Sequence, residues 1–116
     1  MTINERIVDG IAVIDLKGRI TLGEGVGRLR DKINSLLHQG YHKLVISLAG
    51  VEYLDSAGLG EIVGAYATVQ RQGGSLKLVG LTGRIRDLLS ITKLLTVFDT
   101  FDSEQDAVRS FSSVNA

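Results

Sequence analysis

The segment KLVISLAGVEYLDSAGLGEIVGAYATV, residues 43–69, contains an apolar run, a polar turn and a second apolar series in direct succession. Its first part, Lys43–Leu48, is short and mostly apolar, which predicts a central strand covered on both faces. Residues 53–58 then turn the chain, and an apolar series with helical spacing predicts a helix closed by Gly73-Gly74. A strand followed by a helix is the building unit of an α/β fold. The residues of the helical series are Leu59, Ile62, Val63, Tyr66 and Val69.

The residues before this segment predict a hairpin and a further helix. Asp9-Gly10 stands between the apolar runs Ile7-Val8 and Ile11–Leu16, and this dipeptide favours a hairpin because both turn positions need positive φ. A glycine-rich stretch over residues 18–27 follows. Apolar residues with helical spacing then continue up to Gly40 and predict an amphipathic helix ended by that glycine. They are Val26, Leu29, Ile33, Leu36 and Leu37.

The residues after the segment predict two more strands and two more helices. Leu76–Val79 is expected to be a strand, and Val97-Phe98 is a candidate edge strand. Thr82 is placed to cap a helix, because its hydroxyl can accept from the free N–H groups of the first turn. Ser103, with acidic residues in the next turn, marks the start of a last helix. The apolar residues are Ile85, Leu88, Leu89 and Ile91 in the first of these helices and Ala107, Val108 and Phe111 in the second.

Together these elements predict an α/β fold with one mixed sheet of about four to five strands packed by about four helices. A chain of 116 residues buries roughly two thirds of the surface that its unfolded form exposes, so it folds without disulfides. We expect one domain over residues 1–112 and a frayed tail over residues 113–116.

Composition narrows the classes of function. The 13 Lys and Arg residues balance the 13 Asp and Glu residues, so no cationic excess favours nucleic acid as a partner. The chain has no cysteine, which excludes a thiolate nucleophile and cysteine-built metal sites. Its first residues lack the basic start and apolar run of a signal peptide, and no stretch has the ~18 apolar residues that span a bilayer. We therefore expect a cytoplasmic protein without direct membrane insertion.

The sequence offers few groups for catalysis. Its two histidines, His38 and His42, flank a helix end and are expected to be surface residues. The glycines of residues 23–27 match neither nucleotide-binding fingerprint. Ser56 is followed by Gly58, but the residue two positions before it is not glycine, so the pattern of a nucleophile elbow is absent. We therefore predict no enzyme activity, no metal and no cofactor.

Asp55 and Ser56 have a structural and a functional interpretation. Short oxygen-bearing side chains cap helices by accepting from the N–H groups of the first turn, and this explains both residues without a function. Gly58 and Gly60, however, leave the first turn bare of side chains, and a helix N-terminus favours an added anion. A serine at this place is accessible to a kinase, and its phosphate is tolerated electrostatically.

The segment Asp55-Ser56-Ala57-Gly58-Leu59-Gly60 resembles the motif of STAS domains, the family of bacterial anti-sigma-factor antagonists. The resemblance extends from the hairpin through residues 44–48 and 73–78 to Phe98. It implies that Ser56 is phosphorylated by a partner that is both an anti-sigma factor and an ATP-dependent serine kinase, and that a phosphoserine phosphatase reverses this. It also implies a partner-binding surface, in which Leu59 alternatively packs inward. That surface consists of Asp55, Ser56, Ala57, Gly58, Leu59 and Gly60.

The resemblance further implies a charge switch. The unphosphorylated chain sequesters the kinase and frees the sigma factor, whereas a phosphate adds about −1.5 to −2 charges beside Asp55 and releases the kinase. Three places depart from the family pattern. Ser47 stands where many relatives have Asp or Asn, Ala57 often corresponds to Ser, and residues 21–24 replace a segment that often contains Asp. These departures point to a divergent kinase.

Alternatives stay open at this stage. A non-phosphorylated STAS scaffold subunit of a stress-signalling or lipid-transport complex is the second functional hypothesis. Asp55 either shapes the acceptor loop, caps the helix or orients the metal of a phosphate donor. Arg84, Arg86 and Lys93 fit an acidic partner and a solvated helix face equally well. The sequence also leaves the oligomeric state open.

Overall fold

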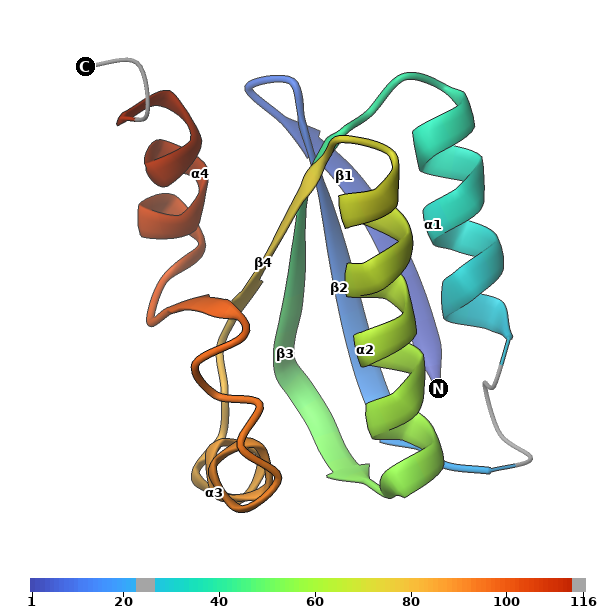
Figure 1. The fold of residues 1–116 in the computed structure, drawn as a ribbon, viewed down its shortest axis with the longest axis vertical. Helices are drawn as coiled ribbons and strands as arrows, with labels where there is room; N and C mark the ends of the chain where they lie inside the picture. The colour runs from blue at the N-terminus through green and yellow to red at the C-terminus, as the bar shows by residue number, and fades with distance from the viewer. Residues whose placement is uncertain (23–26, 114–116) are drawn as a thin grey trace.

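The computed structural model describes residues 1–22 and 27–113, which form one five-stranded sheet with helices on both faces (Figure 1). The strands lie in the order β1-β2-β3-β4-β5. β1 pairs with β2 in antiparallel fashion, and the other neighbours are parallel. The predicted mixed sheet is therefore confirmed. The strands are β1 Thr2–Val8, β2 Ile11–Ile20, β3 Lys43–Leu54, β4 Ser75–Val79 and β5 Asp99–Phe101.

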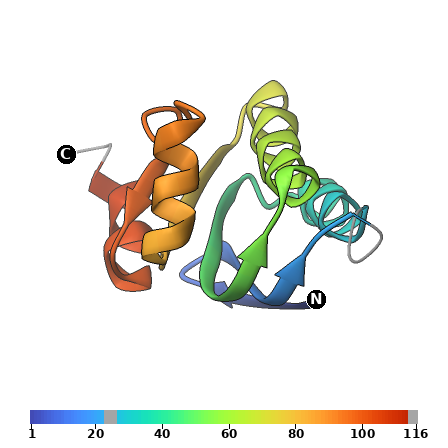
Figure 2. The ribbon, with the colours of Figure 1, turned by 90° about the horizontal axis from the view of Figure 1, so that it is seen from below.

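The helices cover the two faces unequally. α1 and α2 lie side by side on one face and, with α3, enclose the larger of two hydrophobic cores (Figure 2). α4 packs on the opposite face and closes a smaller core (Figure 1). The helices of the described residues are α1 Arg28–His38, α2 Ser56–Arg71, α3 Gly83–Ile91 and α4 Glu104–Ser113.

The alternation of side chains along β3 explains why the sheet has a core on each face. Leu44, Ile46 and Leu48 face the larger core, whereas Val45 between them faces the smaller one. The apolar run of β3 is thus buried on both sides, which confirms the prediction of a central strand.

The hairpin turn between β1 and β2 is also confirmed. Asp9 has φ of 52° and Gly10 has φ of 79°, so both turn residues adopt the left-handed conformation that a two-residue hairpin loop requires. The turn sets Val8 opposite Ile11, and this register continues along β1.

Two predicted helix starts are confirmed by their capping hydrogen bonds. Thr82 Oγ1 accepts a hydrogen bond from the N–H of Ile85 at 3.3 Å, at the start of α3. Ser103 Oγ accepts one from the N–H of Asp106 at 3.1 Å, in the first turn of α4. Each serves a backbone N–H that has no partner within its own helix.

The predicted edge strand at Val97-Phe98 is wrong, because β5 covers Asp99–Phe101. The N–H groups of Val97 and Phe98 both donate to the carbonyl of Leu94, so these residues close a turn instead of pairing with β4. The Phe98 ring packs edge-on against Tyr66 with ring centres 5.0 Å apart. An apolar residue in a turn whose side chain packs into the core cannot be told from a strand residue by its sequence alone.

Other boundaries also differ from the expectation. β3, expected over Lys43–Leu48, continues to Leu54, and β2, expected to end at Leu16, continues to Ile20. α1 begins at Arg28, and Val26 lies outside the described residues, as do the glycines at 23 and 25. Ile91, placed on the apolar side of α3, is 78% exposed, because it follows the buried Leu89 by two residues and so lies on the opposite side of the helix. Ser113, expected in the tail, is the last residue of α4, and residues 114–116 lie outside the described residues.

Candidate functional site

The motif lies where β3 ends and α2 begins. Leu54 is the last residue of β3, Asp55 has an extended backbone and forms the N-cap, and Ser56 is the first residue of α2. The turn expected over residues 53–58 is therefore reduced to Asp55 alone. β2 runs parallel to β3 and ends at Ile20, opposite Leu54. The residues after both strands consequently meet at the same edge of the sheet.

Both oxygens of the Asp55 carboxylate accept hydrogen bonds from backbone N–H groups. Oδ1 accepts from Gly58 at 2.8 Å, and Oδ2 accepts from Leu22 at 3.1 Å. The hydrogen bond from Gly58, followed by that from Leu22, lowers the pKa of Asp55 below its ordinary value, because each favours the charged form. Of the roles left open for Asp55, these contacts show the helix cap. The same side chain joins the chain after β2 to the start of α2.

Ser56 differs from its neighbour in having no hydrogen-bond partner among the described residues. Its side chain is exposed at the first position of α2, and within residues 1–22 and 27–113 its hydroxyl forms no hydrogen bond. Helix capping therefore accounts for Asp55 and leaves Ser56 unexplained. The Ser56 hydroxyl stands beside an ionised carboxylate at the positive end of a helix of 16 residues.

Gly58 is required by the packing of α2 against β2. A Cβ at this position would lie 2.1 Å from the carbonyl oxygen of Ile20 and 2.8 Å from Leu54 Cδ1. Glycine thus lets the first turn of α2 approach the end of β2, and this approach brings the N–H of Leu22 to Asp55. Leu59, the next residue, is buried in the larger core.

Only part of the motif is therefore accessible. Gly58 and Leu59 were both expected at the partner surface, but both are buried in the fold. For Leu59 the structure therefore shows the alternative, which was packing toward the core. Gly60 is exposed, with open space around the position of a Cβ. We define the acceptor surface as the four motif residues that reach the solvent. These are Asp55, Ser56, Ala57 and Gly60.

Exposed apolar side chains border this acceptor surface. Leu22, whose N–H binds Asp55, has a side chain that is 77% exposed. On the other side, a groove of about 620 Å³ runs from Leu54 to α3, where Ile91 and Arg84 line it. A protein that covers Ser56 therefore meets apolar surface next to it, which favours a protein partner over a small solute.

Residues 2–107 match the family model of the STAS domain. The chain belongs to the STAS domain family. This confirms the resemblance carried by the motif at residues 55–60 and extends it over nearly the whole chain.

Several relatives of this STAS domain are anti-sigma factor antagonists. The anti-sigma-B factor antagonist of Bacillus subtilis is 42% identical over 81 residues, which cover 70% of this chain and 73% of that protein. The solved structure of an anti-sigma factor antagonist from Mycobacterium paratuberculosis has a TM-score of 0.82 and 25% identity, covering 94% of this chain and 92% of that one. SpoIIAA, a Bacillus cell fate determinant solved in its phosphorylated form, shares the fold with a TM-score of 0.74 and 20% identity. The match covers 95% of this chain and 99% of that one.

Two residues next to the acceptor surface make contacts that the sequence did not predict. Leu22 could have been found from topology, because the ends of neighbouring parallel strands meet at one edge of a sheet. The other is Glu61, whose side chain is 8% exposed, accepts from the N–H of Gly27 at 2.7 Å and pairs with Arg30 at 3.5 Å. It fastens the start of α1 to α2. No local pattern marks Glu61, since a glutamate inside a helix is usually solvated.

The remaining candidate residues belong to other elements than the acceptor surface. His38 and His42 are exposed at the C-terminal end of α1 and in the loop that follows, as expected. Arg86 and Lys93 are exposed on α3 and in the turn after it. No three His, Asp or Glu side chains of the described ranges are grouped to hold a metal ion. None of the helices described here is both long and apolar enough to cross a membrane.

Proposed function

We propose that this STAS domain is an anti-sigma-factor antagonist whose binding to an anti-sigma factor is switched by phosphorylation of Ser56. The observation that carries the proposal is the exposed Ser56 hydroxyl, which makes no hydrogen bond within the described residues and follows the ionised cap Asp55. Two relatives support it. The Bacillus subtilis relative is named an anti-sigma-B factor antagonist, and SpoIIAA has been solved in a phosphorylated form.

In this proposal the partner is both the anti-sigma factor and an ATP-dependent serine kinase. During transfer, Ser56 Oγ forms a bond to the γ-phosphorus of ATP while the bond to the leaving ADP oxygen breaks, and the hydroxyl proton passes to a base of the kinase. The kinase supplies that base and the magnesium ions. The STAS domain supplies an accessible hydroxyl in a fixed position, and a phosphoserine phosphatase restores it by hydrolysis.

The phosphate is expected to change binding far more than folding. Phosphoserine carries about −1.5 to −2 charges, and the N-terminus of α2 accommodates an anion in the free protein. In the complex the same charge stands in a desolvated interface next to Asp55. Burying an uncompensated charge costs several kcal/mol, and each ~1.4 kcal/mol weakens binding about tenfold. Phosphorylation therefore releases the partner without a change of fold.

The test captures partners from the native cells of this protein with three versions of the full chain. Ser56→Ala removes the acceptor hydroxyl, Ser56→Asp adds a charge at the acceptor, and Ser35→Asp adds the same charge on an exposed serine of α1. We expect Ser56→Ala and Ser35→Asp to retain the kinase and Ser56→Asp to bind it at least about tenfold more weakly. The purified kinase with ATP should then place one phosphate on the wild-type chain, located at Ser56 by peptide mass spectrometry.

Two outcomes contradict the proposal. A phosphate on another residue removes Ser56 as the acceptor, and equal affinity of Ser56→Asp and Ser35→Asp for the kinase removes the charge switch. A stable complex with a permease or an ATPase, in which Ser56 is unmodified and no kinase is present, supports the scaffold function instead.

A further inference from the structure

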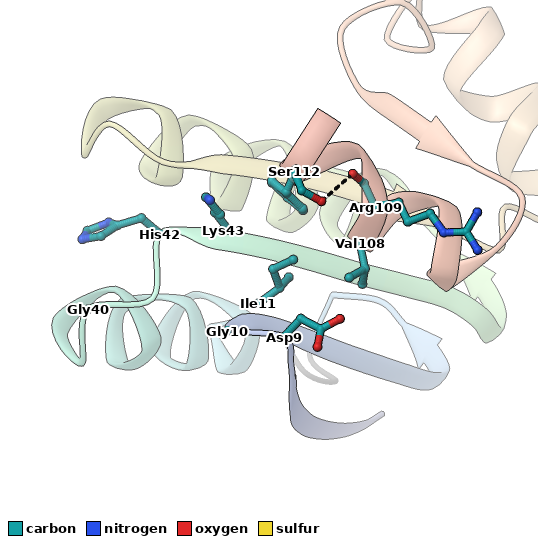
Figure 3. A pocket seen from close by; sticks show the side chains of 10 residues that line it. Asp9, Gly10, Ile11, Gly40, His42, Lys43, Val108, Arg109 and Ser112 are labelled. Carbon is teal, nitrogen blue, oxygen red and sulfur yellow. Dashed lines mark hydrogen bonds between the residues drawn. The ribbon is translucent and has the colours of Figure 1, made fainter. Parts of the chain in front are cut away.

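Figure 3 shows the residues that line a cavity of about 660 Å³. The cavity lies at the start of β3, whereas Ser56 follows the end of that strand. Its walls are the turn between β1 and β2, the loop before β3, and α4. β3 runs from Lys43 at the cavity to Leu54 beside the motif, a strand of 12 residues. At ~3.3 Å per residue this separates the two places by roughly 35 Å. The acceptor surface contributes no residue to the cavity.

The floor of the cavity is apolar. Ile11, Val108 and Phe111 line it, and all three belong to the smaller core that α4 closes. Ile11 and Val108 lie on facing elements, so an apolar group placed between them contacts both the sheet and the helix (Figure 3). A concave apolar floor of this size is typical of sites for small molecules, which occupy about 300–1,000 Å³.

The charged residues of the rim are separated along the cavity. Lys43 lies on the side of Ser112, whereas Asp9 lies on the other side of Ile11, below Val108 (Figure 3). The guanidinium of Arg109 extends away from Lys43. Lys43 forms no ion pair with any residue in the described ranges, so its ammonium group is available to a ligand. A negative group is attracted to the Lys43 end of the cavity.

We propose that this cavity binds a small amphiphilic carboxylate, with its apolar chain against Ile11, Val108 and Phe111 and its carboxylate at Lys43. Lys43, which forms no ion pair among the described residues, matches one negative charge at its end of the cavity. The apolar floor gives affinity for the chain of the ligand, and the separated charges give it one orientation. This site is independent of the phosphorylation of Ser56.

The test is a titration of the full-length, isotope-labelled protein with sodium octanoate, followed by amide NMR shifts. We expect saturable shifts at Gly10, Ile11, Lys43 and residues 108–112, no shifts at residues 55–60, and a Kd of about 1 mM or tighter. Octanol serves as the uncharged probe. Lys43→Gln should raise the Kd for octanoate at least about fivefold and leave that for octanol unchanged. Lys17→Gln, which removes an exposed lysine of β2 outside the cavity, should change neither.

A second variant separates binding from folding. Ser112→Trp fills the cavity from an exposed position at the end of α4, so octanoate binding should be lost while the urea midpoint stays near that of the wild type. Absence of saturable shifts, or an unchanged octanoate Kd in Lys43→Gln, overturns the proposal. If a chain shortened to residue 113 binds octanoate and the full chain does not, residues 114–116 occupy the cavity and the proposal is equally wrong.

Discussion

Gly58→Ala should destabilise the domain although alanine is the better helix former. The added Cβ would stand 2.1 Å from the carbonyl oxygen of Ile20, so the first turn of α2 must move by about 0.9 Å to restore even a 3.0 Å contact. Overpacking against a backbone atom costs about 3 kcal/mol, and the helix propensity of alanine returns about 1 kcal/mol. We therefore expect the free energy of unfolding to fall by about 2 kcal/mol. The displacement also separates the N–H of Leu22 from Asp55.

Gly60→Ala is the matched control on the same helix. Apart from its chain neighbours and its own helix backbone, no atom of the described residues lies within 4 Å of a Cβ at this exposed position. Only the propensity gain of about 0.5–1 kcal/mol therefore applies, and the variant should be more stable than the wild type. Urea unfolding followed by circular dichroism measures both variants, provided that their m-values agree. If Gly58→Ala is as stable as Gly60→Ala, the close approach of α2 to β2 does not constrain this position, and the argument for Gly58 fails.

Three further predictions concern charged groups. Because the pKa of Asp55 is lowered in the folded protein, its carboxylate stabilises the fold above about pH 4, and this contribution is lost as the pH falls through the folded pKa. Asp55→Asn should therefore flatten the acid side of a plot of urea midpoint against pH. Lys77 is 8% exposed, and its ammonium group lies against the rings of Phe101 and Phe111. Lys77→Ala should lower the free energy of unfolding by about 2 kcal/mol, as measured by urea unfolding. Lys77→Met should recover most of this loss by restoring the apolar contacts. Arg6 pairs with two carboxylates at the surface, so Arg6→Gln should cost less than about 1 kcal/mol in low salt, and a loss that persists in high salt would contradict a screened interaction.

The sequence predicted those features of the fold that depend on local patterns. The Asp9-Gly10 turn and the caps at Thr82 and Ser103 follow from the chemistry of one or two residues, so they could be located without knowledge of the rest of the chain. The edge strand could not, because β5 is only three residues long and the neighbouring Phe98 reaches the core from a turn. Short edge strands carry little periodicity, and burial alone does not separate them from turns.

The candidate site was predictable in its position and not in its contacts. The motif indicated Asp55 and Ser56, but the hydrogen bond from Leu22 joins residues 33 positions apart and depends on the parallel pairing of β2 with β3. The same pairing explains why Gly58 faces inward. Glycines in a motif usually suggest an exposed backbone. Gly58 is instead required for packing, because a Cβ at this position would collide with the carbonyl oxygen of Ile20.

The two edges of the sheet affect how this domain associates with other proteins. Charged side chains lie along the β1 edge, where Glu5 pairs with Lys32 and Arg6 is paired as well, and the opposite edge strand, β5, has only three residues. Short or charged edges resist the addition of a further strand. In the proposed complex the partner would therefore contact side chains and helix ends rather than a ladder of backbone hydrogen bonds. Contacts of that kind would be sensitive to a charge added at Ser56, which is what the proposed switch requires.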